Sequence, residues 1–156
     1  MMPTGRTCFI FATMLLGLCS ALPAAERASN TGRVNEITFD DIKLEMQKGD
    51  PYDSSKLTDK VKSFDGKRIK IRGYILPGFQ QNGIKQFVLV RDNMECCFGP
   101  GAMLHDCILV EMVPPAETSF TVRPVSVDGK FTIREFRATP DGNVLAIYHL
   151  DGTEVK

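Results

Sequence analysis

The stretch "GKRIKIRGYI", residues 66–75, decides the fold. Its isoleucines alternate with charged or aromatic residues, and this period of two predicts a strand with one buried face. Gly73 interrupts the series at a position where a strand can bend sharply. We therefore expect a short, bent strand of the kind that begins a small barrel.

Further strands are predicted downstream, where short apolar runs repeat between turn signals. These runs are residues 85–91, 107–113, 120–127, 130–136 and 144–150. Asp-Gly pairs within residues 127–131 and 140–143 predict hairpin turns, because glycine takes positive φ at little cost. Together these signals predict a mainly β fold, a small OB-like β-barrel of five to six strands. A β-sandwich of unspecified topology is the alternative.

Two short helical segments precede the strands. Residues 39–48 begin just after Thr38, which with Asp41 matches an N-cap pattern, and their apolar residues fall on one helical face. Residues 57–64 show apolar spacings of four and three and stop before Gly66. We expect one or two short N-terminal helices packed beside the barrel.

The N-terminal residues resemble a targeting segment. After Arg6, residues 8–18 are apolar and uncharged, but they are fewer than the roughly 20 residues that a bilayer crossing needs. Small residues follow, so we expect residues 1–25 to be a cleaved signal peptide. Residues 26–36 then form a flexible leader, and residues 37–156 form a single domain.

Cleavage after Ala24 or Ala25 predicts a secreted or periplasmic protein without a membrane span in its mature form. A lipid anchor at Cys19 is disfavoured, because Leu18 stands where lipoprotein processing needs a small residue. The chain carries 19 basic and 19 acidic residues without a clustered basic face. This balance argues against a nucleic-acid partner.

A cysteine-rich stretch, "RDNMECCFGPGAMLHDC", spans residues 91–107. Its side chains with soft or imidazole donor atoms are Met94, Cys96, Cys97, Met103, His105 and Cys107. Zinc prefers thiolate and imidazole, whereas cuprous copper prefers thioether with thiolate. The stretch therefore predicts a transition-metal site for zinc first and copper second. The candidate ligands are Cys96, Cys97, His105 and Cys107, with Met103 added for copper.

Side-chain alternation indicates which of these ligands converge. If residues 103–107 are extended, Met103, His105 and Cys107 point to one face. They would form half of a metal site. His149, the other histidine of the chain, is either a further ligand or a packed strand residue.

A disulfide is the alternative to a metal. An exported protein meets an oxidising environment, in which cysteines tend to pair. Cys97 or Cys96 would pair with Cys107, and such a bridge stabilises by about 2 to 3 kcal/mol. Adjacent side chains diverge in an extended chain, so only one of the two neighbouring cysteines is expected to face Cys107.

Three functions remain open on these residues. The first is an exported binding or accessory protein that binds a transition metal. The second is a thiol-disulfide redox protein acting through Cys96 and Cys97, because strained or exposed disulfides are the reactive kind. The third is a disulfide-stapled module that binds a cell-envelope protein. No catalytic signature is present in the sequence, so an enzyme is not favoured and no catalytic residue is assigned.

The stretch "FDGKRIKIRGYILPGFQQNGIKQFVLVRDNMECCFGPGAMLHDCILVEM", residues 64–112, is similar to a bacterial family of exported proteins, domain of unknown function 3299. The motifs "ITFDDIKLEM", "VRPVSVDGKFTIREF" and "AIYHLDGTEV" extend the similarity to residues 37–156. The resemblance implies an exported or periplasmic protein with a link to zinc handling or to cell-envelope transport. Some members carry two spaced cysteines where this chain has adjacent Cys96 and Cys97.

Overall fold

The structure is a computed structural model. It describes residues 34–47, 50–92, 94, 102–137 and 139–156. These residues belong to one compact unit, residues 31–156. Among them, no helix is long and apolar enough to cross a membrane. The predicted signal peptide, together with Cys96 and Cys97, lies outside the described residues.

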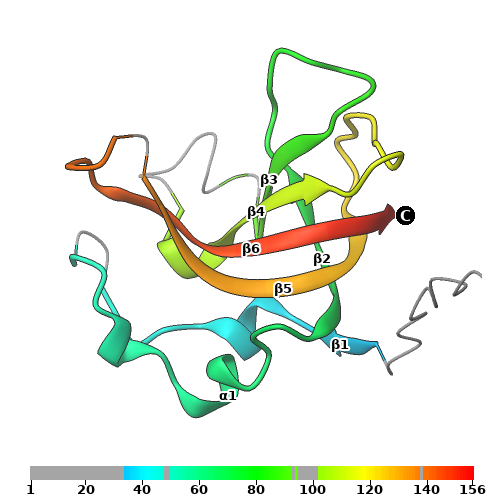
Figure 1. The fold of residues 1–156 in the computed structure, drawn as a ribbon. Coiled ribbons are helices and arrows are strands. Elements are labelled where there is room, and N and C mark those ends of the chain that lie inside the picture. Colours follow the sequence, from blue (N-terminus) through cyan, green and yellow to red (C-terminus); the bar gives the residue numbers. More distant parts are fainter. Residues whose placement is uncertain (1–33, 48–49, 93, 95–101, 138) are drawn as a thin grey trace, which may run out of the picture. The chain divides into compact units, whose positions relative to one another are not determined.

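Six strands form one mixed sheet. They are β1 Asn35–Ile37, β2 Arg68–Ile75, β3 Gln86–Val90, β4 Cys107–Met112, β5 Val125–Arg137 and β6 Val144–Val155. Their order is β1-β2-β3-β4-β6-β5, and β2 also pairs with β5. This last pairing joins strands β2 to β6 into a ring (Figure 1). The predicted mainly β fold is therefore confirmed.

Strand β2 closes the ring because it changes partner along its length. Residues 68–73 pair antiparallel with β5, whereas Tyr74 and Ile75 pair with β3. Gly73 lies at this change, and a Cβ atom there would be 2.6 Å from the carbonyl oxygen of Val90. The glycine permits the close approach of the two backbones, whereas the sequence indicated only a position where the strand can bend.

Alternate strand residues fill the interior of the ring. In β2 the side chains of Ile69, Ile71 and Ile75 are all buried, as the alternation predicted. Phe131 of β5 and Tyr148 of β6 are also buried, with ring centroids 5.2 Å apart. This interior is the hydrophobic core on which the N-terminal segments pack.

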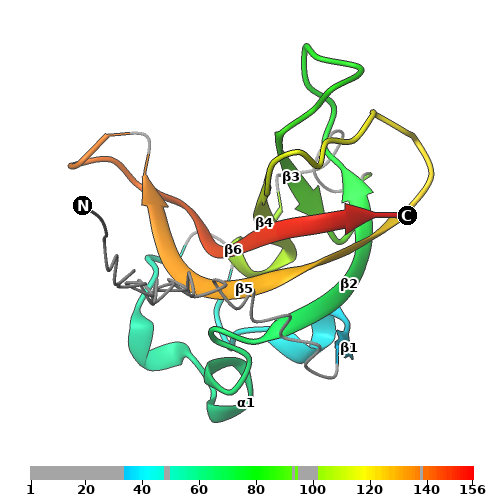
Figure 2. The ribbon, with the colours of Figure 1, turned by 45° about the vertical axis from the view of Figure 1, so that its right-hand side comes forward.

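The N-terminal segments lie along one side of the ring, away from the β2–β3 connection (Figures 1 and 2). They comprise β1, which runs parallel to β2, and three short helices. The helices are the 3-10 helices η1 Phe39–Ile42 and η2 Ser54–Lys56 and the α-helix α1 Asp59–Lys62. The Tyr148 hydroxyl donates to the Ile42 carbonyl oxygen at 2.7 Å, which ties η1 to the core.

The helix predicted over residues 39–48 is wrong beyond its first turn. The cap is present, because the Thr38 backbone N–H donates to the Asp41 carboxylate at 2.7 Å. The helix nevertheless ends at Ile42, and buried Ile42 and Leu44 then alternate with exposed residues. The apolar residues Ile42, Leu44 and Met46 also fit the period of two of an extended chain, and packing against the ring favours this conformation over a helix. The helix predicted within residues 57–64 is present as the shorter α1.

The hairpin predicted at residues 127–131 is also wrong, because β5 runs continuously through them. The strands predicted over residues 120–127 and 130–136 are therefore parts of one strand, β5, and residues 120–124 lead into it. Gly129 lies at a register shift against β6, where a Cβ atom would be 2.5 Å from the Asp151 carbonyl oxygen. Here the glycine marks a close approach between strands and not a turn. The hairpin at residues 140–143 is confirmed as the connection between β5 and β6.

Strand β1 begins within the segment that the sequence indicated as a flexible leader, residues 26–36. Asn35 and Glu36 pair with Ile69 and Lys70 of β2. Three strand residues are too few to show a period in the sequence. Only the presence of β2 beside them gives these residues a partner.

Gly73→Ala should destabilise the fold by about 1 to 3 kcal/mol, because the added methyl group would overlap the Val90 carbonyl oxygen and press on Leu89 and Phe39. Chemical denaturation midpoints measure this loss. Gly78→Ala is the matched control, since a Cβ atom there meets no described atom within 4 Å. Its effect should stay within about 0.5 kcal/mol. Wild-type stability in the Gly73 variant would contradict the account of the ring closure.

Asp41 joins η1 to α1 through a charged contact. Its Oδ1 atom lies 2.7 Å from Lys60 Nζ. The hydrogen bond from Lys60, followed by that from the Thr38 backbone, lowers the pKa of Asp41 from 3.8 to about 2. The unfolded chain therefore takes up a proton at a higher pH than the folded chain does. The stability contributed by this carboxylate is complete above pH 3.8 and is lost as the pH falls toward 2.

Asp41→Asn should remove this part of the acid dependence of the unfolding free energy. The expected contribution is on the order of 1 to 2 kcal/mol, because a pKa difference of one unit corresponds to about 1.4 kcal/mol and the site is partly exposed to solvent. Unfolding free energies measured at acid and neutral pH give the slope. Glu45→Gln removes an exposed carboxylate nearby and serves as the control. If the unfolding free energy of Asp41→Asn changes with pH as steeply as that of the wild type, Asp41 does not contribute to the acid dependence of stability.

Candidate functional site

The described part of the cysteine-rich stretch lies where β3 ends and β4 begins. The 3-10 helix η3, Leu104–Asp106, leads directly into β4. The backbone N–H of Arg91, which follows β3, donates to the carbonyl oxygen of Asp106 at 3.0 Å. This hydrogen bond holds the two ends of the stretch together, so the side chains around η3 have a fixed support.

The convergence predicted for Met103, His105 and Cys107 assumed an extended chain, and this assumption is wrong. Met103 is the N-cap residue of η3. In a 3-10 helix every third side chain, and not every second, lies on one face. Met103 and His105 nevertheless line the same hollow. Cys107 is half-buried at the first position of β4.

A hollow of about 380 Å³ lies beside η3. Its lining comes from the segments that follow η1, follow β3 and surround η3: Lys43, Met46, Arg91, Asp92, Met103, His105 and Asp106. A second hollow, of about 460 Å³, shares Met46 and Met103 and reaches the β5–β6 connection. The two methionines therefore border both spaces.

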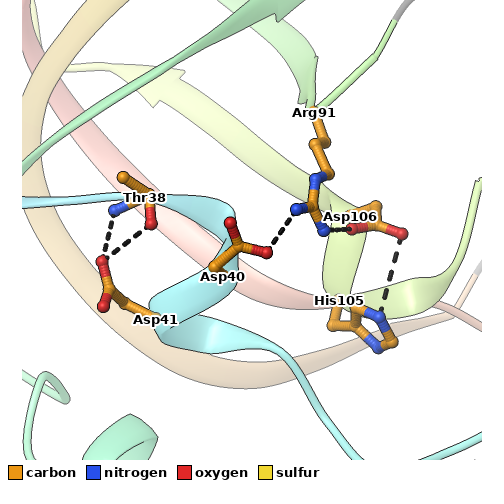
Figure 3. Close-up of polar contacts among 6 residues, drawn as sticks. All are labelled: Thr38, Asp40, Asp41, Arg91, His105 and Asp106. Carbon is orange, nitrogen blue, oxygen red and sulfur yellow. Dashed lines mark hydrogen bonds and ion pairs between the residues drawn. The ribbon is translucent and has the colours of Figure 1, made fainter.

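Arg91 organises the polar side of the smaller hollow (Figure 3). Its guanidinium contacts the Asp40 carboxylate through Nη2, and Nη1 lies 3.4 Å from Asp106 Oδ1. The hydrogen bond to Asp40, more than that to Asp106, raises the pKa of Arg91. Since Asp40 belongs to η1 and Asp106 to η3, the arginine connects the N-terminal segments to the site.

His105 is buried beside Asp106, with 2% of its surface exposed. Its Nε2 atom lies 3.8 Å from Asp106 Oδ2, whereas Nδ1 finds no hydrogen-bond partner among the described residues. Figure 3 shows one ring nitrogen toward Asp106 and the other away from it. Burial lowers the pKa of His105, which Asp106 opposes and which Lys43 and Arg91 reinforce. The imidazole is therefore neutral at neutral pH.

The contacts of His105 determine which nitrogen carries its proton. A neutral imidazole has one N–H donor and one acceptor nitrogen. The Asp106 carboxylate lies 3.8 Å from Nε2, beyond hydrogen-bond distance, and its negative charge favours a proton on that nitrogen; we therefore assign the proton to Nε2, and Nδ1 keeps its lone pair. Protein ligands to metals commonly have this arrangement, with a carboxylate behind one nitrogen and the metal on the other.

His149 lies in a different environment on β6. Its Nδ1 atom is 2.9 Å from Arg134 Nη2, and its ring packs edge-on against Phe136 at a centroid distance of 6.3 Å. Arginine only donates, so Nδ1 accepts and the proton belongs on Nε2, which has no partner within the described ranges. Burial, reinforced by Arg134, lowers the pKa of His149. His149 therefore offers a donor and not a lone pair, in keeping with a packed strand residue.

Five lining residues of the hollow were not identified from the sequence: Lys43, Met46, Arg91, Asp92 and Asp106. Asp106 stands next to His105 in the chain, and this carboxylate-imidazole pair was an available signal. Met46 comes from a distant segment that was expected to be helical, so only the fold brings it to the site. The predicted ligands Cys96 and Cys97 lie outside the described residues.

The described donors do not form a typical zinc site. In the part of the chain that the structure describes, no three His, Cys, Asp or Glu side chains lie close enough to hold one metal ion. The lining of the hollow instead includes His105, whose Nδ1 atom is buried, together with two thioether residues, Met46 and Met103.

The fold and the hollow define a small β protein whose strands close into a ring and whose η3 segment carries a buried histidine. The chain belongs to the family described as "Protein of unknown function (DUF3299)", whose sequence profile matches residues 19–156. This result confirms the resemblance found over residues 64–112.

A solved structure supports the same fold. The crystal structure of a DUF3299 family protein from Pseudomonas aeruginosa PAO1 is similar to this chain, with a TM-score of 0.54 and 19% sequence identity. The similarity covers 80% of this chain and 96% of that chain, and at this identity it concerns the fold alone. No curated protein matches the chain.

Both histidines should make the fold less stable in mild acid. Burial lowers the pKa of His105 and of His149 below 6.5, so below this pH the unfolded chain binds protons that the folded chain does not. Their contribution to stability is therefore complete above pH 6.5 and declines as the pH falls through this value. Unfolding free energies measured across this range give the slope.

The two histidines can be separated by substitution. His105→Gln and His149→Gln should each flatten the decline in stability, because each removes one group that the folded state keeps neutral. Lys43→Gln keeps both histidines and should retain most of the decline, which makes it a control for a charge change beside His105. If the stability of both histidine variants declines with falling pH as much as that of the wild type does, other groups cause the decline.

Proposed function

We propose that the chain is an exported binding or accessory protein that holds a transition-metal ion at His105. One observation carries the proposal: no described residue donates a hydrogen bond to the buried Nδ1 atom of His105, a residue that lines a hollow. A buried polar atom left without a partner costs about 1 to 3 kcal/mol. A metal ion at this atom would recover that cost.

The groups behind His105 support a binding role. Arg91 hydrogen-bonds to Asp106 at 3.4 Å, and Asp106 lies 3.8 Å from Nε2 of His105, so the carboxylate acts on the ring through its charge. A carboxylate behind a ligating histidine favours one tautomer and increases the affinity of the histidine for metal. The pKa of His105 is lowered by burial, so a metal ion need not displace a proton at neutral pH.

The cysteines of the same stretch would complete a zinc site. Zinc takes four ligands and prefers thiolate and imidazole, which Cys96, Cys97 and Cys107 would supply together with His105. The alternatives that involve Cys96 and Cys97, a disulfide to Cys107 and thiol-disulfide exchange, fall on residues outside the described ones and stay predictions. Zinc is the first candidate from the sequence, and copper is the second.

We also propose that the ring is an OB-like barrel. Five strands, β2 to β6, take part in it, with β2 and β5 antiparallel and β4 and β6 parallel. An OB-fold is a five-stranded, partly open Greek-key barrel that binds ligands on one face and on its loops. A binding function is compatible with this architecture. Export to the periplasm or medium is supported by the apolar residues 8–18 and the small residues that follow them.

His105→Gln should abolish the binding of Zn²⁺ and Cu⁺ to the purified exported chain, because it removes the Nδ1 lone pair. Metal content after dialysis and competition with chromogenic chelators measure the binding. His149→Gln is the matched control, because His149 is similarly buried but its Nδ1 atom already accepts from Arg134. Metal retained by the His105 variant at the wild-type level would refute the proposal, as would a wild-type chain that binds neither ion.

Asp106→Asn tests the support behind the ring. The change keeps the shape of the side chain but removes the negative charge that lies 3.8 Å from Nε2 and favours the proton there. Metal affinity should fall by roughly 10- to 100-fold, the usual effect of losing such an outer contact. Asp40→Asn removes the other carboxylate of Arg91 and should have the smaller effect. A larger loss from Asp40→Asn than from Asp106→Asn would contradict this role.

A further inference from the structure

We infer that the ion held at His105 is cuprous copper, bound by the thioethers of Met46 and Met103 together with the imidazole. This inference rests on the proposed metal site and names its ligand set and its ion. Met46 is the new element, because it belongs to a segment far from the cysteine-rich stretch. The three side chains line one hollow, and each belongs to the described part of the chain.

The donor atoms favour a soft, monovalent ion. Thioether sulfur and imidazole nitrogen are ligands for Cu⁺, whereas zinc sites use thiolate, imidazole and carboxylate. Met46 and Met103 are both half-buried, so their sulfur atoms are sheltered without being enclosed in the core. Methionine is flexible and adapts to the position of a bound group. One imidazole and two thioethers are sufficient for an ion with a low coordination number.

The carboxylates of the hollow are already engaged. Asp106 faces both His105 and Arg91, at 3.8 and 3.4 Å. Asp92 accepts the Met94 backbone N–H at 2.8 Å. A zinc ion at His105 would have to share these carboxylates with their present partners or take its remaining ligands from outside the described residues. A cuprous ion requires neither, because the two thioethers remain available.

The lining of the hollow carries charges of both signs. Lys43 and Arg91 are its cations, Asp92 and Asp106 are its carboxylates, and Asp40 also contacts Arg91. The preference for Cu⁺ therefore rests on the thioether donors and not on the charge of the lining.

Methionine-to-leucine variants test the inference, because leucine keeps the volume and removes the sulfur. Met46→Leu and Met103→Leu are compared with Met112→Leu, which removes a buried thioether from β4 outside the lining of the two hollows described above. Cu⁺ affinity is measured without oxygen by competition with bicinchoninate. Zn²⁺ affinity is measured in parallel with a chromogenic chelator. Thermal unfolding verifies that each variant is folded.

The expected result separates the two ions. Met46→Leu and Met103→Leu should each weaken Cu⁺ binding by at least about tenfold, the lower end of the effect of an outer contact, since a direct ligand is lost. Zn²⁺ binding should be unchanged in both, and Met112→Leu should leave both ions unaffected. Equal Cu⁺ affinity in the three methionine variants would overturn the inference.

The failure of this inference differs from the failure of the proposed function. A wild-type chain that binds Zn²⁺ at His105 but not Cu⁺ would overturn the cuprous assignment and support the metal site. A chain that binds neither ion would overturn both. If His105→Gln and Met46→Leu each lose Cu⁺ binding while Met112→Leu keeps it, the result supports both the metal site and the cuprous assignment.

Discussion

The pairing of β2 with β5 is the constraint on which the rest of the described structure depends. It turns a six-stranded sheet into a ring and encloses the core that Phe131 and Tyr148 fill. The change of partner at Gly73 makes the closure possible, because a side chain at that position would meet the backbone of β3. The Tyr148 hydroxyl then fixes η1 through the Ile42 carbonyl oxygen, so the N-terminal segments follow from the same closure.

The ring also determines where the site can form. It places the end of β3 beside the start of β4, and Arg91 joins the two ends to η1 through Asp40 and Asp106. Within this frame His105 is kept neutral, which avoids the cost of a buried charge. Its Nδ1 atom, which lacks a hydrogen bond from any described residue, is a local departure from the rule that buried polar atoms are paired. Such departures are expected at functional sites, where a ligand completes what the fold leaves open.

The sequence predicted those parts of the fold that local periodicity controls. The alternation of β2 and the runs of β3 and β4 were found because each strand buries one face on the core. The residues around Leu44 were misassigned because their spacing fits a helix and a strand, and only packing on the ring decides between them. The role of Gly129 was missed for a similar reason, since a turn and a close approach between strands both call for glycine. In the candidate site, His105 was proposed from its chemistry, whereas Met46 lines the hollow through tertiary structure that no local pattern contains.

The central claim is that His105 is neutral and offers a bare Nδ1 lone pair to a metal. Nitrogen-15 NMR of the histidine ring, recorded on the metal-free chain at neutral pH, tests it most directly, because the two tautomers and the imidazolium give distinct patterns. The account predicts the tautomer with hydrogen on Nε2, and an Nδ1 resonance that shifts when Zn²⁺ or Cu⁺ is added while that of His149 does not. A proton on Nδ1, or a charged ring, would contradict it.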